Sequence, residues 1–264
     1  MDAAALAERA LADYAAEPGR SALIRIRAAD RVWEGGVAAD AVHPAASLLK
    51  LAVAIAAEEA IADGSLDATR RTTVAELGAT PADRSVLDLL DPARDIDVAE
   101  MLGLMLGASD NPCARRLVEL LGLSRIADVV ARLGCAGTAV EADAEAGVGG
   151  VTTCRDALAL LTAASDPVHH PASARALRHS IRNSRIPLGA TEDDVRIAHK
   201  TGTLAGLAHD VAVLECAGGT AEVAFLTQDQ HDTLVTGYAM GLCTREVLTA
   251  WGLSVRTTTS AVGR

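Results

Sequence analysis

The amino-acid sequence predicts an α+β fold: an antiparallel sheet of about five strands, flanked by terminal helices, with an inserted helical subdomain. Strand-like alternation occurs near both ends of the chain, and helical patterns separated by Gly, Pro, Ser or Asp fill the middle. The most economical assembly pairs the two ends in one sheet. We therefore expect a discontinuous sheet subdomain formed by residues 1–40 and 185–264, and an all-helical subdomain formed by residues 41–184, within one catalytic domain.

The first part of the chain predicts a helix followed by two strands. Apolar residues of 2–16 recur at helical spacing and end at Pro18-Gly19. Ser21–Arg27 alternates in the manner of a strand, and a turn at 28–30 leads into a second strand through Trp33.

The middle of the chain predicts a buried helix and five further helices. The apolar segment from Ser47 to Ile61 closes at Asp63-Gly64, which is typical of a helix surrounded by core. The other helices are expected over 96–107, 112–121, 124–133, 154–164 and 172–183.

The last part of the chain returns to strands before it closes with a helix. Strands are expected at Val195–Ala198, His209–Glu215 and Glu222–Thr227, with a hairpin turn at 217–220. Residues 232–252 predict the final helix. A cleft between the two subdomains is then the expected site.

Charge and composition favour a small-molecule partner. The chain has 35 acidic and 24 basic residues, a net charge of -11, and only five aromatic residues. Such a surface repels a nucleic-acid backbone and an anionic membrane alike, and it has few platforms on which bases stack. We therefore expect neither nucleic acid nor membrane as a partner, and the composition does not indicate an oligomeric state.

The beginning of the chain and its cysteines favour the cytoplasm. Residues 1–9 have no basic segment followed by an apolar core, and no apolar run approaches the ~18 residues of a membrane span. The five cysteines are odd in number and contain no C-x-x-C pair, as expected of buried thiols in a reducing compartment. Export is expected only if a leader has been removed.

Three short motifs occur in a fixed order and contain both lysines of a chain that has 22 arginines. They are Ser47-Leu48-Leu49-Lys50, Ser109-Asp110-Asn111 and Lys200-Thr201-Gly202. The first motif is weak by itself, but chance supplies the ordered set at only about 10⁻⁵. A lysine retained among so many arginines suggests an amine that must lose a proton, which a guanidinium does not do.

The residue types in these motifs suit acyl transfer. Ser47 and Lys50 are one helical turn apart, so the amine can act as a base for the hydroxyl of the nucleophile. Ser109 can relay a proton to the leaving group, and Lys200 adds a second positive charge. The backbone N–H groups of Ser47 and Thr203 can hold an oxyanion. For substrate binding we expect Asn111 to contact an amide, Thr201 and Thr203 to contact a carboxylate, and Gly202 to admit the substrate.

The motifs S-x-x-K, S-D-N and K-T-G in this order resemble those of the class A β-lactamase and penicillin-binding-protein superfamily. The resemblance covers nearly the whole chain and extends to the segments 151–156, 183–187 and 199–210. It implies the β-lactamase/transpeptidase-like fold, a Ser47 nucleophile, an acyl-enzyme, and hydrolysis of an amide or ester without metal or other cofactor. Hydrolysis of a β-lactam, and hence antibiotic resistance, is the activity that it implies most directly.

The sequence departs from the resistance enzymes at the deacylation step. Those enzymes carry a deacylating Glu followed four residues later by Asn, whereas 141–150 contains acidic residues but no Asn. Glu145 or Glu141 is a candidate base, and the alternative is a solvated acidic loop. No arginine lies between Lys200 and Arg245, so Arg185 is the candidate partner of a substrate carboxylate.

Two other functions remain open. A D-alanyl peptidase, an esterase or an acyl-transfer tailoring enzyme would fit the atypical loop, because each tolerates slow deacylation. A catalytically silent ligand-binding module is the alternative of a different class, although all three motifs are intact. The histidines at 169, 170, 199 and 209 lack the spacing of a metal site, so no metal is expected.

Overall fold

The computed structural model describes residues 2–78, 85–190 and 195–253. Its helices are α1 (Ala3–Tyr14), η1 (Ala46–Leu49), α2 (Lys50–Ala62), α3 (Val74–Leu77), η2 (Val86–Leu89), α4 (Val98–Gly107), α5 (Asn111–Leu121), α6 (Leu123–Arg132), α7 (Cys154–Ala164), α8 (Pro171–Arg178), η3 (Ile186–Gly189) and α9 (Thr233–Ala250), where η marks a 3₁₀-helix. Its strands are β1 (Arg20–Ala28), β2 (Arg31–Val37), β3 (His43–Pro44), β4 (Arg71–Thr73), β5 (Asp95–Asp97), β6 (Ala139–Asp143), β7 (Gly147–Thr152), β8 (Arg196–Leu204), β9 (Leu207–Cys216) and β10 (Gly219–Thr227). Within these ranges, every helix is too short or too polar to cross a bilayer.

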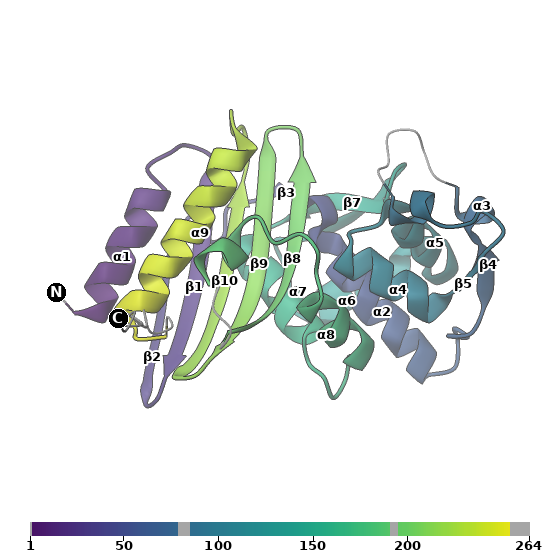
Figure 1. The fold of residues 1–264 in the computed structure, drawn as a ribbon, viewed down its shortest axis with the longest axis horizontal. Helices are drawn as coiled ribbons and strands as arrows, with labels where there is room; N and C mark the ends of the chain where they lie inside the picture. Colours follow the sequence, from purple (N-terminus) through teal and green to yellow (C-terminus); the bar gives the residue numbers. More distant parts are fainter. Residues whose placement is uncertain (1, 79–84, 191–194, 254–264) are drawn as a thin grey trace, which may run out of the picture.

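The main sheet joins the two ends of the chain, as the sequence predicts. Its strand order is β2-β1-β10-β9-β8, and the neighbouring strands are antiparallel. Figure 1 shows α1 and α9 covering one face of this sheet, while the helices from the middle of the chain lie beyond its other face. The α+β fold class is confirmed.

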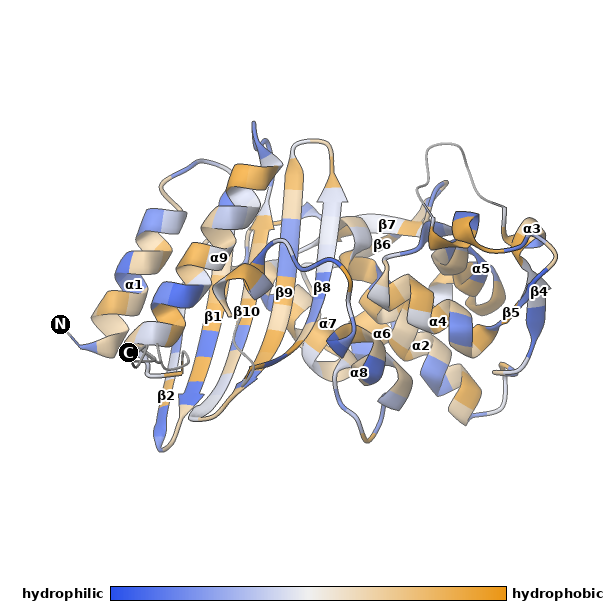
Figure 2. Ribbon diagram, viewed as in Figure 1, coloured by the Kyte–Doolittle hydropathy of each residue, from blue (hydrophilic) through white to orange (hydrophobic). Residues whose placement is uncertain are grey.

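Two hydrophobic cores explain why the sheet is covered on both faces. Alternate residues of a strand point to opposite faces, so Leu23 and Val211 join the core under the helical region, while Ile24 and Ala212 join the core under α1 and α9. Figure 2 colours much of β9 as hydrophobic, which fits a strand buried on both sides.

Helix α2 is the centre of the helical region. Nine of its 13 residues are buried, from Lys50 to Ala60, because neighbouring helices surround it on most sides. Small alanines along this helix allow those neighbours to pack closely. A helix that is hydrophobic on most sides is buried in this way, and its N-terminus carries Lys50, directly after the turn that contains Ser47.

Residues 41–184 contain two small sheets in addition to the expected helices. One has the order β3-β7-β6, and the other pairs β4 with β5. The acidic segment 141–150 is therefore largely a β-hairpin, since β7 pairs with both β6 and β3. The glycines at 147, 149 and 150 hide the strand pattern in the sequence, and the partner strand β3 is remote along the chain.

Three element boundaries differ from the predicted ones at places that bear on the site. The strand expected to end at Ala198 continues to Leu204, so the third motif lies inside β8. The helix expected from Ser47 begins at Lys50, after a 3₁₀ turn. The helix expected over 172–183 ends at Arg178, and residues 179–185 form the link that leads to η3.

Candidate active site

Ser47 lies in the 3₁₀ turn that opens α2, and its side chain is half-buried. The backbone N–H of Lys50 bonds to the carbonyl of Ser47, which places the lysine one turn further on. The preceding residue, Ala46, has φ 47°. This left-handed conformation is unfavourable for a residue with a Cβ, and such strain is frequent beside reacting groups.

Lys50 is fully buried at the start of α2, and its amine points to the connection between α4 and α5. Its Nζ donates to the carbonyl oxygen of Ser109 at 2.7 Å and to Oδ1 of Asn111 at 2.5 Å, and it lies 3.5 Å from Oγ of Ser109. The structure therefore brings together the lysine of the first motif and the serine and asparagine of the second.

Ser109 is held in an uncommon conformation by the residue that follows it. Its φ is 62°, and Asp110 forms the N-cap of α5 by accepting from the N–H of Cys113 at 3.1 Å. The other oxygen of Asp110 accepts from the hydroxyl of Ser85 at 2.5 Å. The carboxylate of the second motif thus shapes the loop that presents Ser109.

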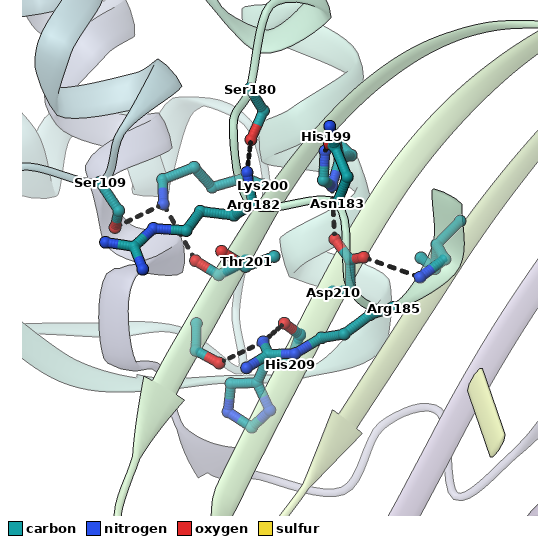
Figure 3. Close-up of polar contacts among 12 residues, drawn as sticks. Ser109, Ser180, Arg182, Asn183, Arg185, His199, Lys200, Thr201, His209 and Asp210 are labelled. Carbon is teal, nitrogen blue, oxygen red and sulfur yellow. Dashed lines mark hydrogen bonds and ion pairs between the residues drawn. The ribbon is translucent and has the colours of Figure 1, made fainter. Parts of the chain in front are cut away.

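Lys200 approaches the same serine from β8. Its Nζ donates to Oγ of Ser109 at 2.8 Å and to the carbonyl of Thr201 at 2.9 Å, and the side chain is almost completely buried (Figure 3). Burial and then the nearby charge of Lys50 hold the pKa of Lys200 well below its usual value. One hydroxyl therefore lies between two amines, an arrangement suited to moving a proton. We refer to Lys50, Ser109, Asn111 and Lys200 as the lysine cluster.

Strand β8 is the edge strand of the main sheet, and η1 packs against it. A Cβ on Gly202 would lie 3.2 Å from the Cβ of Ala46 and 3.2 Å from Cδ2 of His209. A glycine at this position thus permits β8 to approach the turn that carries Ser47. Thr201 is buried, whereas Thr203 is exposed at the end of the strand.

A second buried polar cluster lies behind Lys200. Adjacent residues of a strand face opposite sides, and His199 points away from Ser109 toward Asp210, with Nδ1 3.0 Å from Oδ1. Its Nε2 lies 3.0 Å from Oδ1 of Asn183, and the other oxygen of Asp210 accepts from the N–H of Ile186 at 3.0 Å (Figure 3). We refer to Asn183, Ile186, His199 and Asp210 as the aspartate cluster. It fixes the segment before η3 to the strand that carries Lys200.

Arg185 belongs to this segment and is only 8% exposed, and its side chain reaches β8 and β9. Its Nη1 donates to the carbonyl of Gly202 at 2.8 Å and to that of His209, and its Nη2 donates to Oγ1 of Thr203 at 2.6 Å. Burial lowers the pKa of Arg185, while the negative charge of Asp210 acts in the opposite direction. The guanidinium thus forms two hydrogen bonds with the motif strand β8 and one with its neighbour β9.

His209 connects β9 with the strand before Ser47. Its Nε2 lies 2.7 Å from the carbonyl of Pro44, and its Nδ1 accepts from the N–H of Thr227 at 3.0 Å. These partners require a neutral ring with the proton on Nε2. Burial, the largest effect, lowers the pKa of His209 to about 3, which agrees with that tautomer.

Glu141 and Glu145 both have exposed side chains. Glu141 lies on β6, and β7 separates this strand from β3, which leads to Ser47. Glu145 lies in the hairpin turn, where its carbonyl accepts from Nη1 of Arg115 at 2.7 Å. Neither carboxylate forms a hydrogen bond with the lysine cluster among the contacts of the described residues.

Histidine, cysteine and acidic side chains do not gather into a metal-binding group anywhere in the described ranges. The cluster behind Lys200 was not assigned a role from the sequence, although it lies in segments similar to the superfamily. The sequence did contain one indication of this cluster: Asp210 directly precedes the apolar run Val211–Leu214 of a predicted strand. A charged residue in such a strand is almost never fully buried unless it is paired.

Comparisons with known proteins agree with this architecture. The profile of the β-lactamase enzyme family matches residues 6–251. The β-lactamase from Sphaerobacter thermophilus DSM 20745 is 24% identical, with a TM-score of 0.82 over 96% of this chain and 99% of that chain. PBP-A is 21% identical, with a TM-score of 0.79 over 94% of this chain and 96% of that chain. A class A β-lactamase from Bacteroides cellulosilyticus DSM 14838 is 17% identical, with a TM-score of 0.77 over 95% and 98% of the two chains. Curated protein sequences give no match.

These solved structures superpose on nearly the whole of this chain, so the fold is that of class A β-lactamases and of PBP-A. The family match is more specific, because it spans nearly the entire sequence. The chain belongs to the β-lactamase enzyme family, and this membership indicates a hydrolase.

Proposed function

We propose that this protein is a serine hydrolase that forms an acyl-enzyme on Ser47 and opens a β-lactam or a related cyclic amide. The observation that carries the proposal is the position of the Ser109 hydroxyl, 2.8 Å from the amine of Lys200 and 3.5 Å from that of Lys50. Two amines that share one hydroxyl in this way can take a proton from a nucleophile and deliver a proton to a leaving nitrogen.

In the first step, Lys50 in its neutral form takes the proton of the Ser47 hydroxyl while Oγ attacks the carbonyl carbon. The negative charge that develops on the carbonyl oxygen is held by the N–H groups of Ser47 and Thr203. When the C–N bond breaks, Ser109 gives its proton to the leaving nitrogen and recovers one from the lysines. Water then cleaves the Ser47 ester, which returns the hydroxyl and releases the acid.

Family membership supports this reaction class, and one solved relative supports the intermediate. A variant of PBP-A, 21% identical to this chain, is described as an acyl-enzyme complex with penicillin G. For the present chain, we propose that Asn111, Thr201 and Thr203 contact the substrate amide and carboxylate, and that Gly202 admits the substrate beside β8.

A second candidate differs only in the fate of the acyl-enzyme. The exposed positions of Glu141 and Glu145 favour an enzyme whose deacylation is slow, such as a D-alanyl peptidase, an esterase or an acyl-transfer enzyme. In a peptidase or an esterase, water then cleaves the ester slowly, whereas in an acyl-transfer enzyme another nucleophile takes the acyl group. The nucleophile and the lysine cluster would serve both candidates in the same way.

Intact-mass spectrometry with penicillin G tests the proposal directly. The protein is sampled from seconds to hours, beside Ser47→Ala and beside Ser124→Ala, which removes an exposed serine on α6. The expected result is a penicillin-sized mass increase in the unmodified protein and in Ser124→Ala, and none in Ser47→Ala. If penicillin leaves the mass unchanged, a short D-alanyl depsipeptide serves as a second acylating probe. A folded protein that neither probe acylates would be the silent binding module.

The lifetime of the adduct separates the two candidates. Rapid loss with release of opened penicillin supports β-lactam hydrolysis, and Glu141→Gln and Glu145→Gln then identify the base as the variant whose adduct persists. A wild-type adduct that survives for hours supports the slow-deacylation candidate. Addition of a D-amino acid or hydroxylamine then shows whether another nucleophile relieves the ester.

A further inference from the structure

Arg185 approaches one particular peptide group of the motif strand. Its Nη1 donates to the carbonyl of Gly202 at 2.8 Å, and the peptide that carries this carbonyl also carries the N–H of Thr203. The described part of the chain has no cis peptide bonds, so the two groups point in opposite directions. The carbonyl faces Arg185, and the N–H faces the other side of the same peptide.

The side to which the Thr203 N–H points is the side where the oxyanion is expected. Strand β8 is the last strand of its sheet, and the turn carrying Ser47 packs against it, with Ala46 close to Gly202. In the proposed reaction, Thr203 and Ser47 provide the two oxyanion donors. The guanidinium therefore lies directly behind one of those donors.

We propose that Arg185 is a positioning residue that strengthens and aims the oxyanion donor of Thr203 through the Gly202–Thr203 peptide. This role rests on the proposed function, because it assigns a task to the oxyanion site. A hydrogen bond to a peptide carbonyl polarises the N–H at the opposite end of that peptide. A cation makes this effect larger than a neutral donor does, because charge-assisted hydrogen bonds are stronger.

Two further contacts suit this task. Nη2 of Arg185 donates to Oγ1 of Thr203 at 2.6 Å, which fixes the residue whose N–H is polarised. Nη1 also donates to the carbonyl of His209, the residue paired with Gly202 across the sheet. A planar guanidinium with several donors can bridge these acceptors at once, whereas a lysine amine is a single flexible point.

The same contacts argue against a direct clamp on the substrate. An arginine that clamps a carboxylate frequently presents two parallel N–H groups to it. In Arg185 both terminal nitrogens already bond to β8, and the side chain is 8% exposed. Asp210 lies near enough to influence this cation electrostatically, so the buried charge has a counter-ion within the protein. The clamp and the positioning role predict different substrate dependence.

A matched pair of acylating ligands distinguishes the two roles. Penicillin G carries a carboxylate, and its methyl ester is the same molecule without that charge. With the proposed role, Arg185→Met lowers the acylation rate constant by about tenfold for both ligands, since a donor is weakened rather than removed. A loss confined to the free acid would overturn the proposal in favour of the clamp. An unchanged rate with both ligands would also overturn it.

The choice of variants separates this effect from misfolding. Arg185→Lys keeps the charge, and we expect a loss smaller than that of Arg185→Met. Arg178→Met is the matched control, because Arg178 is a neighbouring arginine whose partner is Glu215 rather than the motif strand. We expect this control to leave the acylation rate unchanged. All rates are compared at a temperature at which each variant retains the native circular dichroism spectrum.

Two spectroscopic readouts complete the test. In the acyl-enzyme formed with ¹³C-labelled penicillin, Arg185→Met should raise the stretching frequency of the ester carbonyl, because a weaker oxyanion site polarises it less. In the ligand-free protein, the same substitution should move the amide proton of Thr203 upfield, and Arg178→Met should not. This second readout needs no acyl-enzyme. A wild-type protein that is never acylated thus refutes the proposed function, whereas an unmoved Thr203 amide refutes the role of Arg185.

Discussion

On one side of β8, Lys50 and Lys200 approach the same serine; on the other side, His199 contacts Asp210 and Arg185 lies close by. The lysine cluster brings two amines into a buried space, and its Ser109 has a left-handed backbone. The aspartate cluster offsets its cationic surroundings with a carboxylate, and none of its residues has a positive φ. Strand β8 therefore separates two regions. On the side of the lysine cluster, buried like charges and a left-handed backbone both raise the free energy of the folded state. On the side of the aspartate cluster, a carboxylate balances the positive charge.

This difference indicates how the fold maintains a reactive site. Buried like charges and strained residues cost free energy, and they persist only when their surroundings determine them firmly. The aspartate cluster supplies such surroundings, because it joins η3, β8 and β9 through hydrogen bonds of 3.0 Å. We therefore expect substitutions in the lysine cluster to impair chemistry, and substitutions in the aspartate cluster to impair stability.

The largest expected effect is the loss of chemistry when Lys50 is replaced. Lys50→Met removes the proposed base and should lower the acylation rate by about 10²–10⁴. It should also raise the pKa of Lys200, because one of the nearby positive charges that lower it is gone. Quenched intact-mass kinetics measures the rate, and Arg125→Met, which alters a half-buried arginine of α6 that pairs with Asp63, is the control. A loss of less than threefold would remove Lys50 from the mechanism.

The next largest effect is the loss of stability when Asp210 is replaced. Asp210→Ala leaves His199, the N–H of Ile186 and the buried charge of Arg185 without their carboxylate, and should lower the free energy of unfolding by about 3–5 kcal/mol. Urea denaturation measures this change, and Asp128→Ala, at an exposed position of α6, should change it by less than about 0.5 kcal/mol. If the Asp210 variant were stable but inert, the proposed division between the two sides of β8 would be wrong.

The sequence predicted the lysine cluster more completely than the aspartate cluster. The two lysines are the only ones in the chain, and both stand in motifs, so residue type alone indicated chemistry. Asn183 and His199 are ordinary polar residues whose partners are supplied only when β8 pairs with β9 and the link before η3 packs against β8. The assembly of both chain ends into one antiparallel sheet followed from the strand patterns, whereas the hairpin β6–β7 was missed because its glycines conceal the alternation of a strand.

The pH dependence of stability offers a third test, on the side of β8 that faces Ser47. The pKa of His209 is about 3 in the folded protein, whereas an unfolded histidine titrates near ~6.5. As the pH falls through this interval, the unfolded state binds a proton that the folded state does not. The free energy of unfolding should therefore decrease by about 1.4 kcal/mol per pH unit from this residue.

Replacement of His209 should flatten this part of the pH profile. His209→Gln keeps a donor that can reach the carbonyl of Pro44 but cannot take up the proton. Urea denaturation between pH 4 and pH 6.5 gives the slope, and His169→Gln, which alters an exposed histidine, is the control. An unchanged slope in His209→Gln would mean that this ring does not remain neutral in the folded protein.

The smallest expected effect concerns backbone strain, and the chain offers a close pair of positions for it. Ala46 has φ 47° beside Ser47, and Ala38 has φ 48° in the turn after β2. Glycine relieves a left-handed alanine by about 1–2 kcal/mol, while its freedom in the unfolded chain costs about 0.5–1 kcal/mol. Both Ala→Gly variants should therefore gain about 0.5 kcal/mol in unfolding free energy. Only Ala46→Gly should slow acylation, by a few-fold, because the turn that presents Ser47 loses a restraint. Equal acylation rates in the two variants would show that the strain at Ala46 contributes to neither the position nor the reactivity of the serine. The functional cost on this side of β8 would then lie in its two buried amines and in the left-handed backbone of Ser109.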